Sequence, residues 1–342
     1  MQTIPAPDNA RPDTSTLLPL GDYDRILVMF SGGKDSTALV LHMLDLMAAA
    51  GVPRERLELW HQLVDGAPEE PGFMDWPVTH AYCEAVAQAL DLPIRYQWRE
   101  GGFLREMLRE DAPTAPVTVQ REDGVRETKG GRGPAGTRLR FPQVSADLTE
   151  RWCSAYLKID VARRAVARDP RLRTGRFLLV TGERREESPG RARYATVERH
   201  ATSNAERRVD HWRPILGWPE ESVWGTMRDA GIVPHPCYFV GFARASCGHC
   251  LFQRANERAT ARAVDPAGFE QVAIREAGTG YTIERKESGR QLADRGELLV
   301  PQAVLEDWRP VLMSRTYDRP ARVSPALWLL PPGAYRGGAG PS

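Results

Sequence analysis

The chain has 342 residues, of which 42% are hydrophobic and 27% are charged, and its formal net charge is +1. A charge near zero excludes a global electrostatic attraction to nucleic acid or membrane, and no apolar run approaches the roughly 18 residues that a membrane span needs. The length exceeds what one comfortable hydrophobic core organises, so we expect a main domain with an appended part.

Strand and helix patterns alternate along the first two-thirds of the chain. This alternation predicts the α/β class, with an open, mostly parallel twisted sheet that carries helices on both faces. Residues 111–145 break the rhythm because they are rich in Gly, Pro, Arg and Thr, and they predict a long surface loop. The expected strands are 25–30, 57–64, 93–98 and 177–180, and the expected helices are 37–50, 78–92 and 220–230.

The segment SGGKDST, residues 31–37, lies between the first expected strand and the first expected helix. Its glycines let backbone N–H groups turn toward an anion, and the helix N-terminus adds positive partial charge. Asp35 is expected to cap the helix and to help hold Mg²⁺ through water. The candidate phosphate-binding residues are Ser31, Gly32, Gly33, Lys34, Asp35 and Ser36.

The pattern Ser-Gly-Gly-x-Asp-Ser after a strand resembles the PP-loop ATP pyrophosphatases, which have an adenine nucleotide alpha hydrolase-like fold. The resemblance implies that ATP and Mg²⁺ bind here and that ATP is cleaved to AMP and pyrophosphate. Catalysis would consist mostly of positioning and charge neutralisation. The catalytic residues that it implies are Lys34, Asp35, Ser36 and Arg184.

A second motif, residues 182–191, follows the expected strand 177–180 and resembles the phosphoadenylyl-sulfate reductase-like branch of the same superfamily. Its arginines can clamp phosphate or a sulfate-like oxyanion. Together with Trp212–Ile215, Trp218, Val223–Trp224 and His235–Pro236, it extends the resemblance over roughly residues 20–255. The further residues expected around the nucleotide are Asp65, Gly182, Arg184, Glu187 and Arg191.

The chain has five cysteines, an odd number that favours metal or redox chemistry over a disulfide framework. Cys153, Cys237, Cys247 and Cys250 can complete a tetrahedral thiolate site for a [4Fe–4S] cluster or, as the lesser alternative, Zn²⁺; a site without metal also stays open. Their order along the chain is similar to that in the iron–sulfur PP-loop proteins of DNA phosphorothioation (Dnd/Ssp-type) systems. Cys83 lies on an apolar helical pattern and is expected to be a buried thiol.

Four functions follow as hypotheses. The first is an ATP pyrophosphatase that adenylylates an oxyanion for sulfur incorporation, with DNA as acceptor and a cysteine desulfurase as sulfur donor; the Arg-rich segment 130–140 is a candidate DNA contact. The second is a reductase of adenylyl sulfate or its 3′-phosphorylated form, disfavoured because no cysteine follows Cys250 to act as nucleophile. The third is a tRNA-thiolating enzyme, and the fourth is a non-catalytic nucleotide-binding subunit.

The predicted organisation has four parts. Residues 1–20 form a flexible tail without the features of a signal peptide, which predicts a cytoplasmic protein. Residues 21–235 form the nucleotide-binding domain, residues 236–330 form a cysteine-bearing and helical region, and residues 331–342 form a second flexible tail. The sequence does not determine the acceptor of AMP or the oligomeric state.

Overall fold

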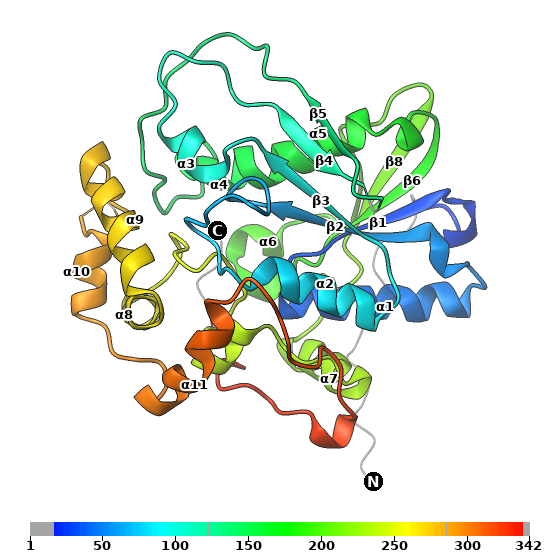
Figure 1. Ribbon diagram of the computed structural model, residues 1–342. Coiled ribbons are helices and arrows are strands. Elements are labelled where there is room, and N and C mark those ends of the chain that lie inside the picture. The colour runs from blue at the N-terminus through cyan, green and yellow to red at the C-terminus, as the bar shows by residue number, and fades with distance from the viewer. Residues whose placement is uncertain (1–16, 122, 285, 338–342) are drawn as a thin grey trace.

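The structure is a computed structural model that describes residues 17–121, 123–284 and 286–337 (Figure 1). Residues 1–16 and 338–342 of the two predicted tails lie outside the described residues. Residues 331–337 lie against the rest of the chain, since the Gly333 amide donates to the Tyr238 carbonyl at 2.9 Å. In the described part of the chain, every helix is too short or too polar to cross a membrane.

Within the described residues, eight strands form one sheet in the order β5-β4-β3-β2-β1-β6-β8-β7. The central strands β3, β2, β1, β6 and β8 are parallel, whereas β4 and β5 at one edge and β7 at the other are antiparallel. The strands are β1 (Arg25–Met29), β2 (Leu57–Leu63), β3 (Ile94–Arg99), β4 (Val117–Gln120), β5 (Arg126–Lys129), β6 (Gly175–Val180), β7 (Val197–Arg199) and β8 (Arg207–Trp212).

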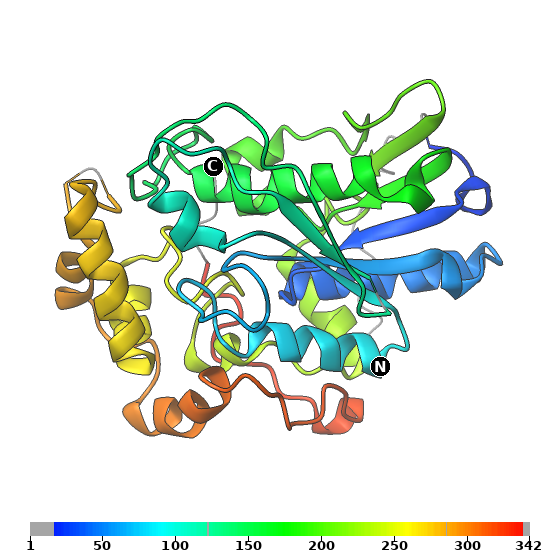
Figure 2. The ribbon, with the colours of Figure 1, turned by 45° about the horizontal axis from the view of Figure 1, so that its top comes forward.

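Helices cover both faces of this sheet, with α1, α2 and α7 on one side and α5 on the other (Figure 1). Both views place α8, α9 and α10 together at one end of the molecule, apart from the helices on the sheet (Figure 2). The helices are α1 (Lys34–Ala49), α2 (Thr79–Ala89), α3 (Gly102–Met107), α4 (Trp152–Ser154), α5 (Asp160–Arg168), α6 (Pro189–Ala192), α7 (Glu220–Ala230), α8 (Ala255–Val264), α9 (Pro266–Thr279), α10 (Gly289–Asp294) and α11 (Gln302–Leu312).

Strand β1 explains why both faces are covered. Ile26 and Val28 pack with helices α1 and α2 in one buried cluster, whereas Leu27 between them packs in a second cluster that includes Val166 of α5. Successive side chains of a strand point to opposite faces, so an uninterrupted apolar strand requires a layer on each side. The predicted α/β class with a mostly parallel sheet is therefore confirmed.

The prediction of an unbroken loop over 111–145 is wrong in part, because this segment contains β4 and β5, which extend the sheet beyond β3. Strand β5 is exposed and polar, as edge strands usually are. Its composition is therefore similar to that of a loop, which is why the sequence did not predict a strand here. Strand β8 is absent from the sequence prediction because it carries Arg207, Asp210 and His211, which are nevertheless buried and hydrogen-bonded.

Candidate functional site

The phosphate loop, residues 31–37, turns sharply from β1 into α1. Gly32 has φ +75°, a left-handed conformation that favours glycine. Gly33 is the N-cap residue of α1 and has no side chain to cap it, while Ser36 Oγ and Thr37 Oγ1 each donate to the Gly33 carbonyl at 3.0 Å. The prediction that Asp35 caps this helix is wrong, because its carboxylate lies in the first turn and contacts two cations.

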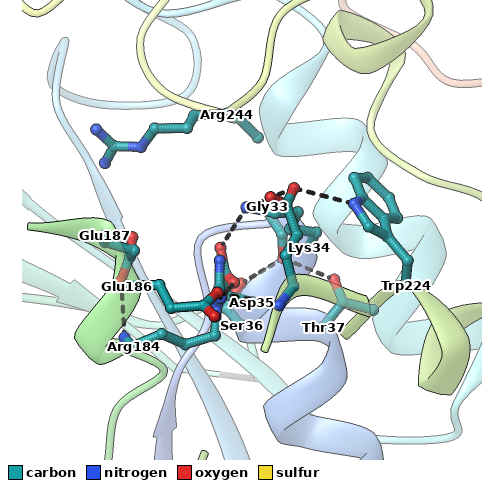
Figure 3. Close-up of polar contacts among 12 residues, drawn as sticks. Gly33, Lys34, Asp35, Ser36, Thr37, Arg184, Glu186, Glu187, Trp224 and Arg244 are labelled. Atoms are coloured by element: carbon teal, nitrogen blue, oxygen red, sulfur yellow. Dashed lines mark hydrogen bonds and ion pairs between the residues drawn. The ribbon is translucent and has the colours of Figure 1, made fainter. Parts of the chain in front are cut away.

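Those two cations are Lys34 and Arg184 (Figure 3). Lys34 Nζ donates to Asp35 Oδ2 at 2.9 Å, and Arg184 Nε donates to Asp35 Oδ1 at 2.5 Å. Burial by itself would raise the pKa of Asp35, but the positive charges of Lys34 and Arg184 outweigh it and lower the pKa. The cations are also near Glu220 and Glu186, respectively. A buried cation–carboxylate–cation arrangement therefore marks the start of α1, where an anion would bind.

The second motif packs directly on this loop. A Cβ at Gly182 would lie 3.1 Å from the Asp35 carbonyl oxygen, a tight contact, so the two backbones approach each other closely here and a larger residue would require one of them to shift. The Glu187 carboxylate accepts the Arg184 amide at 2.8 Å and forms an ion pair with Arg191. The structure thus places Gly182 and Arg184 against Asp35, and it links Glu187 to Arg184 and Arg191 to Glu187.

Asp65 lies in the loop that follows β2. Its carboxylate accepts the amides of Phe73 at 3.0 Å and of Met74 and Asp75 at 2.9 Å, which closes the turn after β2. In the ranges that the structure describes, no hydrogen bond or ion pair joins Asp65 to the phosphate loop. The structure therefore gives Asp65 a loop-organising position at the carboxyl end of β2, and its place around a nucleotide stays a prediction.

A cavity of about 100 Å³ opens beside Ser31, at the carboxyl ends of β1 and β2. Burial raises the pKa of Asp75 to about 7, with the charge of Asp65 as the next cause. Lys158 also lines the cavity, and among the described residues no hydrogen bond or ion pair neutralises its amine. The residues that line the cavity include Phe30, Ser31, His61, Asp75, Thr79, Lys158, His235, Ala245, Ser246 and Cys247.

Sequence reasoning missed Lys158 and Asp75 as site residues, since neither belongs to a recognised motif. The one sequence signal for Lys158 is that lysine is rare in this chain, where arginine supplies most of the positive charge. Lys158 lies on a short π-helix, Ala155–Ile159, a local irregularity that frequently accompanies functional sites.

The four cysteines predicted to bind a metal are not gathered into one site. In the part of the chain that the structure describes, no three His, Cys, Asp or Glu side chains are placed to hold a metal ion. Cys153, Cys247 and Cys250 are partly buried and influence one another electrostatically, whereas the charged neighbours of Cys237 are Asp75 and Lys34. As placed, the four thiols do not fit a [4Fe–4S] cluster or a Zn²⁺ ion. Cys83 is buried, in agreement with its predicted structural role.

Two of the three arginines of the predicted DNA-contacting segment 130–140 are engaged within the chain. Arg138 donates to Glu106 at 2.9 Å and lies over the rings of Trp152 and Tyr156. Arg140 forms an ion pair with Glu150. These interactions stabilise the irregular segment before α4 and leave fewer cations for an external phosphate backbone than the sequence suggests.

Residues 134–252 match the family model of the phosphoadenosine phosphosulfate reductase domain. The matched stretch contains the 182–191 motif and four of the five cysteines, and it begins downstream of the phosphate loop. An uncharacterized 37.8 kDa protein in the gpa 5′ region of Escherichia phage 186 is 34% identical over 134 residues, which are 39% of this chain and 38% of the phage protein.

Two solved structures align with this chain at low similarity. The FMN adenylyltransferase of Candida glabrata, in complex with FMN and an ATP analogue, is 12% identical with a TM-score of 0.35, and the alignment covers 71% of this chain and 60% of that enzyme. Yeast FAD synthetase in complex with FAD is 11% identical with a TM-score of 0.34, over 91% of this chain and 84% of that chain.

The two glycines Gly32 and Gly51 provide a test of the loop geometry. Both have positive φ, but a Cβ at Gly32 would lie 2.8 Å from Cys83 Sγ, whereas a Cβ at Gly51 would meet nothing within 4 Å. Gly51→Ala is expected to cost about 1–2 kcal/mol from backbone strain alone. Gly32→Ala should cost clearly more in denaturant unfolding and should also weaken nucleotide binding. Equal costs for both variants would contradict the packed geometry of the loop.

Proposed function

We propose that this chain is an ATP pyrophosphatase that transfers AMP to an oxyanion acceptor and so activates the acceptor for sulfur incorporation. The observation that carries the proposal is the start of α1, where the glycine turn, the helix N-terminus and the Lys34–Asp35–Arg184 arrangement meet. Backbone amides and two fixed cations at a helix N-terminus suit the terminal phosphates of a nucleotide.

In the proposed reaction, an acceptor oxygen attacks the α-phosphorus of ATP while the bond from that phosphorus to the bridging oxygen breaks. Pyrophosphate leaves with the electron pair of that bond. Lys34 and Arg184 stabilise the charge that develops on the leaving group, and Asp35 holds the two cations in place. Mg²⁺, when bound, would supply further positive charge to the phosphates. The chain thus contributes positioning and charge rather than a covalent intermediate.

The experiment that tests this proposal is a pyrophosphate-release assay on purified protein, with AMP measured in parallel. One pyrophosphate is expected for each AMP, counted as free AMP plus AMP bound to the acceptor, and the true acceptor should accelerate pyrophosphate release. Nucleotide binding is measured independently by calorimetry with an ATP analogue whose α,β-bridge is carbon. Protein that neither binds the analogue nor releases pyrophosphate would exclude this function.

We further propose that the acceptor is a phosphate of the DNA backbone, with a cysteine desulfurase as the sulfur donor. The support is the order of the cysteines, with Cys153 before the 182–191 motif and Cys237, Cys247 and Cys250 after it. Arg132, exposed in segment 130–140, is the cation of that segment best placed for a DNA backbone. DNA is expected to increase pyrophosphate release, and its binding should weaken steeply as salt rises. Release that is indifferent to DNA would count against this acceptor.

We propose separately that Cys153, Cys237, Cys247 and Cys250 bind a [4Fe–4S] cluster, with Zn²⁺ as the alternative, in a closer arrangement of the thiols than the one in this structure. The support is the number of thiols and the preference of both metals for thiolate ligands. Iron, sulfide and zinc analysis of anaerobically purified protein tests this. Protein that contains none of the three would exclude a metal.

A second candidate function is reduction of adenylyl sulfate or its 3′-phosphorylated form, which the domain match over residues 134–252 favours. Such an enzyme releases sulfite and AMP or its 3′-phosphate and consumes no ATP. An assay for sulfite with thioredoxin as reductant separates the two functions. Sulfite release without ATP cleavage would replace the first proposal with the second.

A further inference from the structure

Tyr238 connects the phosphate loop to the cysteine-bearing segment. It lies on the 3-10 helix η6 (Pro236–Val240), is 1% exposed, and packs its ring edge-on against Trp224. Its hydroxyl oxygen accepts two backbone N–H groups, from Lys34 at 2.9 Å and from Ala245 at 3.2 Å. The first amide opens helix α1, and the second lies two residues before Cys247.

The hydroxyl of Tyr238 has one proton left to donate. A phenol oxygen accepts through two lone pairs and donates one O–H, and both lone pairs are occupied by amides here. Within the described ranges, no hydrogen bond uses that proton. A Cβ at Gly33 would lie 3.5 Å from this hydroxyl and 3.4 Å from Ala245 Cβ, so the loop, the hydroxyl and the segment are in direct contact.

The cysteine turn beyond this contact is anchored from its other side. The carbonyl of Gly248 accepts from Gln253 at 2.7 Å, and the carbonyl of Cys250 accepts from the buried Arg258 at 2.7 Å. Residues 248–250 are therefore fixed to the region around α8, whereas residues 245–247, which line the cavity, are joined to the phosphate loop through Tyr238.

We propose that Tyr238 is a positioning residue that couples nucleotide occupancy of residues 31–37 to the conformation of residues 245–247. The inference rests on the proposed binding of a nucleotide at that loop. A phosphate oxygen that accepts the Lys34 amide removes one of the two donors from the Tyr238 oxygen and provides an acceptor for its free proton. The hydroxyl then holds the Ala245 amide more tightly, so the cavity wall next to Cys247 becomes more ordered when nucleotide is bound.

Amide hydrogen exchange on the full chain, with and without the α,β-methylene ATP analogue, tests this coupling. In the wild type, the analogue should slow exchange in peptides that cover 31–37 and in peptides that cover 244–250, the latter on the order of fivefold. In Tyr238→Phe, peptides over 31–37 should remain protected by the analogue, and those over 244–250 should no longer respond.

Tyr23→Phe is the matched control. Its hydroxyl is also buried and also has two partners, since it accepts the Leu18 amide at 3.0 Å and donates to Asp210 at 2.7 Å. This variant should respond to the analogue as the wild type does. Coupling that survives in Tyr238→Phe, or that is lost in Tyr23→Phe as well, would overturn the role of Tyr238.

The wild-type measurement also separates this inference from the proposed function. Protection at 31–37 without any change at 244–250 overturns the coupling alone, and it does so even if Tyr238→Phe fails to fold. No protection at either segment removes both the coupling and the nucleotide site. Protection at both segments supports both.

Discussion

Asp35→Asn is expected to lower the kcat for pyrophosphate release by about 100-fold or more, with little increase in KM. The asparagine keeps the shape of the side chain but removes the charge that holds Lys34 Nζ and Arg184 Nε in place. Loss of a negative charge does not weaken the attraction of the site for an anionic triphosphate. The effect should therefore fall on the transition state, where the two cations must be correctly positioned.

Asp45→Asn is the control for this variant. Asp45 lies on the same helix, α1, is exposed to solvent, and should be replaced without effect on kcat or KM. Both variants are compared by steady-state pyrophosphate release, and circular dichroism checks that each is folded. A rise in KM with unchanged kcat in Asp35→Asn would show that the carboxylate acts in binding and would contradict the positioning role.

The sequence predicts those residues of the site that belong to short continuous motifs. Residues 31–37 follow an apolar strand and begin a helix, and residues 182–191 follow another strand. Because the carboxyl ends of parallel strands meet at one edge of a sheet, the two motifs were expected to lie close together. The contact between Gly182 and the backbone of Asp35 is in accord with this expectation.

The rest of the site depends on contacts that no short pattern encodes. The Tyr238 hydroxyl accepts the Lys34 amide although the two residues are 204 positions apart in the sequence. Tyr238 lies in an apolar segment, whose sequence indicates only a buried core position. Lys158 lines the cavity from the short π-helix Ala155–Ile159. The carboxylate of Asp65 accepts three amides of its own loop. A carboxylate or hydroxyl has many possible partners, and tertiary packing decides which of them it meets.

The same limit explains why β8 was missed. Its charged residues resemble a surface segment, but Asp210 accepts from Tyr23 and Arg208, and Arg207 donates to backbone carbonyls of residues 166, 172 and 202. Buried polar groups are tolerated when each has a partner. Hydrophobic periodicity therefore predicts the apolar central strands. It fails for a strand such as β8, whose buried polar side chains form hydrogen bonds with residues far away in the sequence.

Glu58→Ala is expected to destabilise the folded state by about 3–5 kcal/mol, the largest loss of stability that we predict for this chain. Glu58 is 1% exposed, and its carboxylate accepts two hydrogen bonds from Arg171, both at 2.9 Å, and one from Trp60 at 2.9 Å. Arg95 lies 3.4 Å away. Removal of the carboxylate takes one buried anion away from both Arg95 and Arg171 and removes the acceptor of the Trp60 N–H.

Glu69→Ala is the matched control, because Glu69 also forms a two-pronged ion pair with an arginine, Arg126, but on the surface, with its side chain 60% exposed. Solvent screens such a pair, so its loss should cost less than about 1 kcal/mol. Denaturant unfolding of both variants measures the difference.

Glu58 lies near the amino end of β2, whereas the phosphate loop follows the carboxyl end of the parallel strand β1. The nucleotide affinity of folded Glu58→Ala should therefore be unchanged. Similar costs for the two variants would mean that burial does not govern the Glu58 network. A weakened nucleotide affinity would mean that the amino end of the sheet also shapes the site, contrary to the separation of stability and function that the strand directions imply.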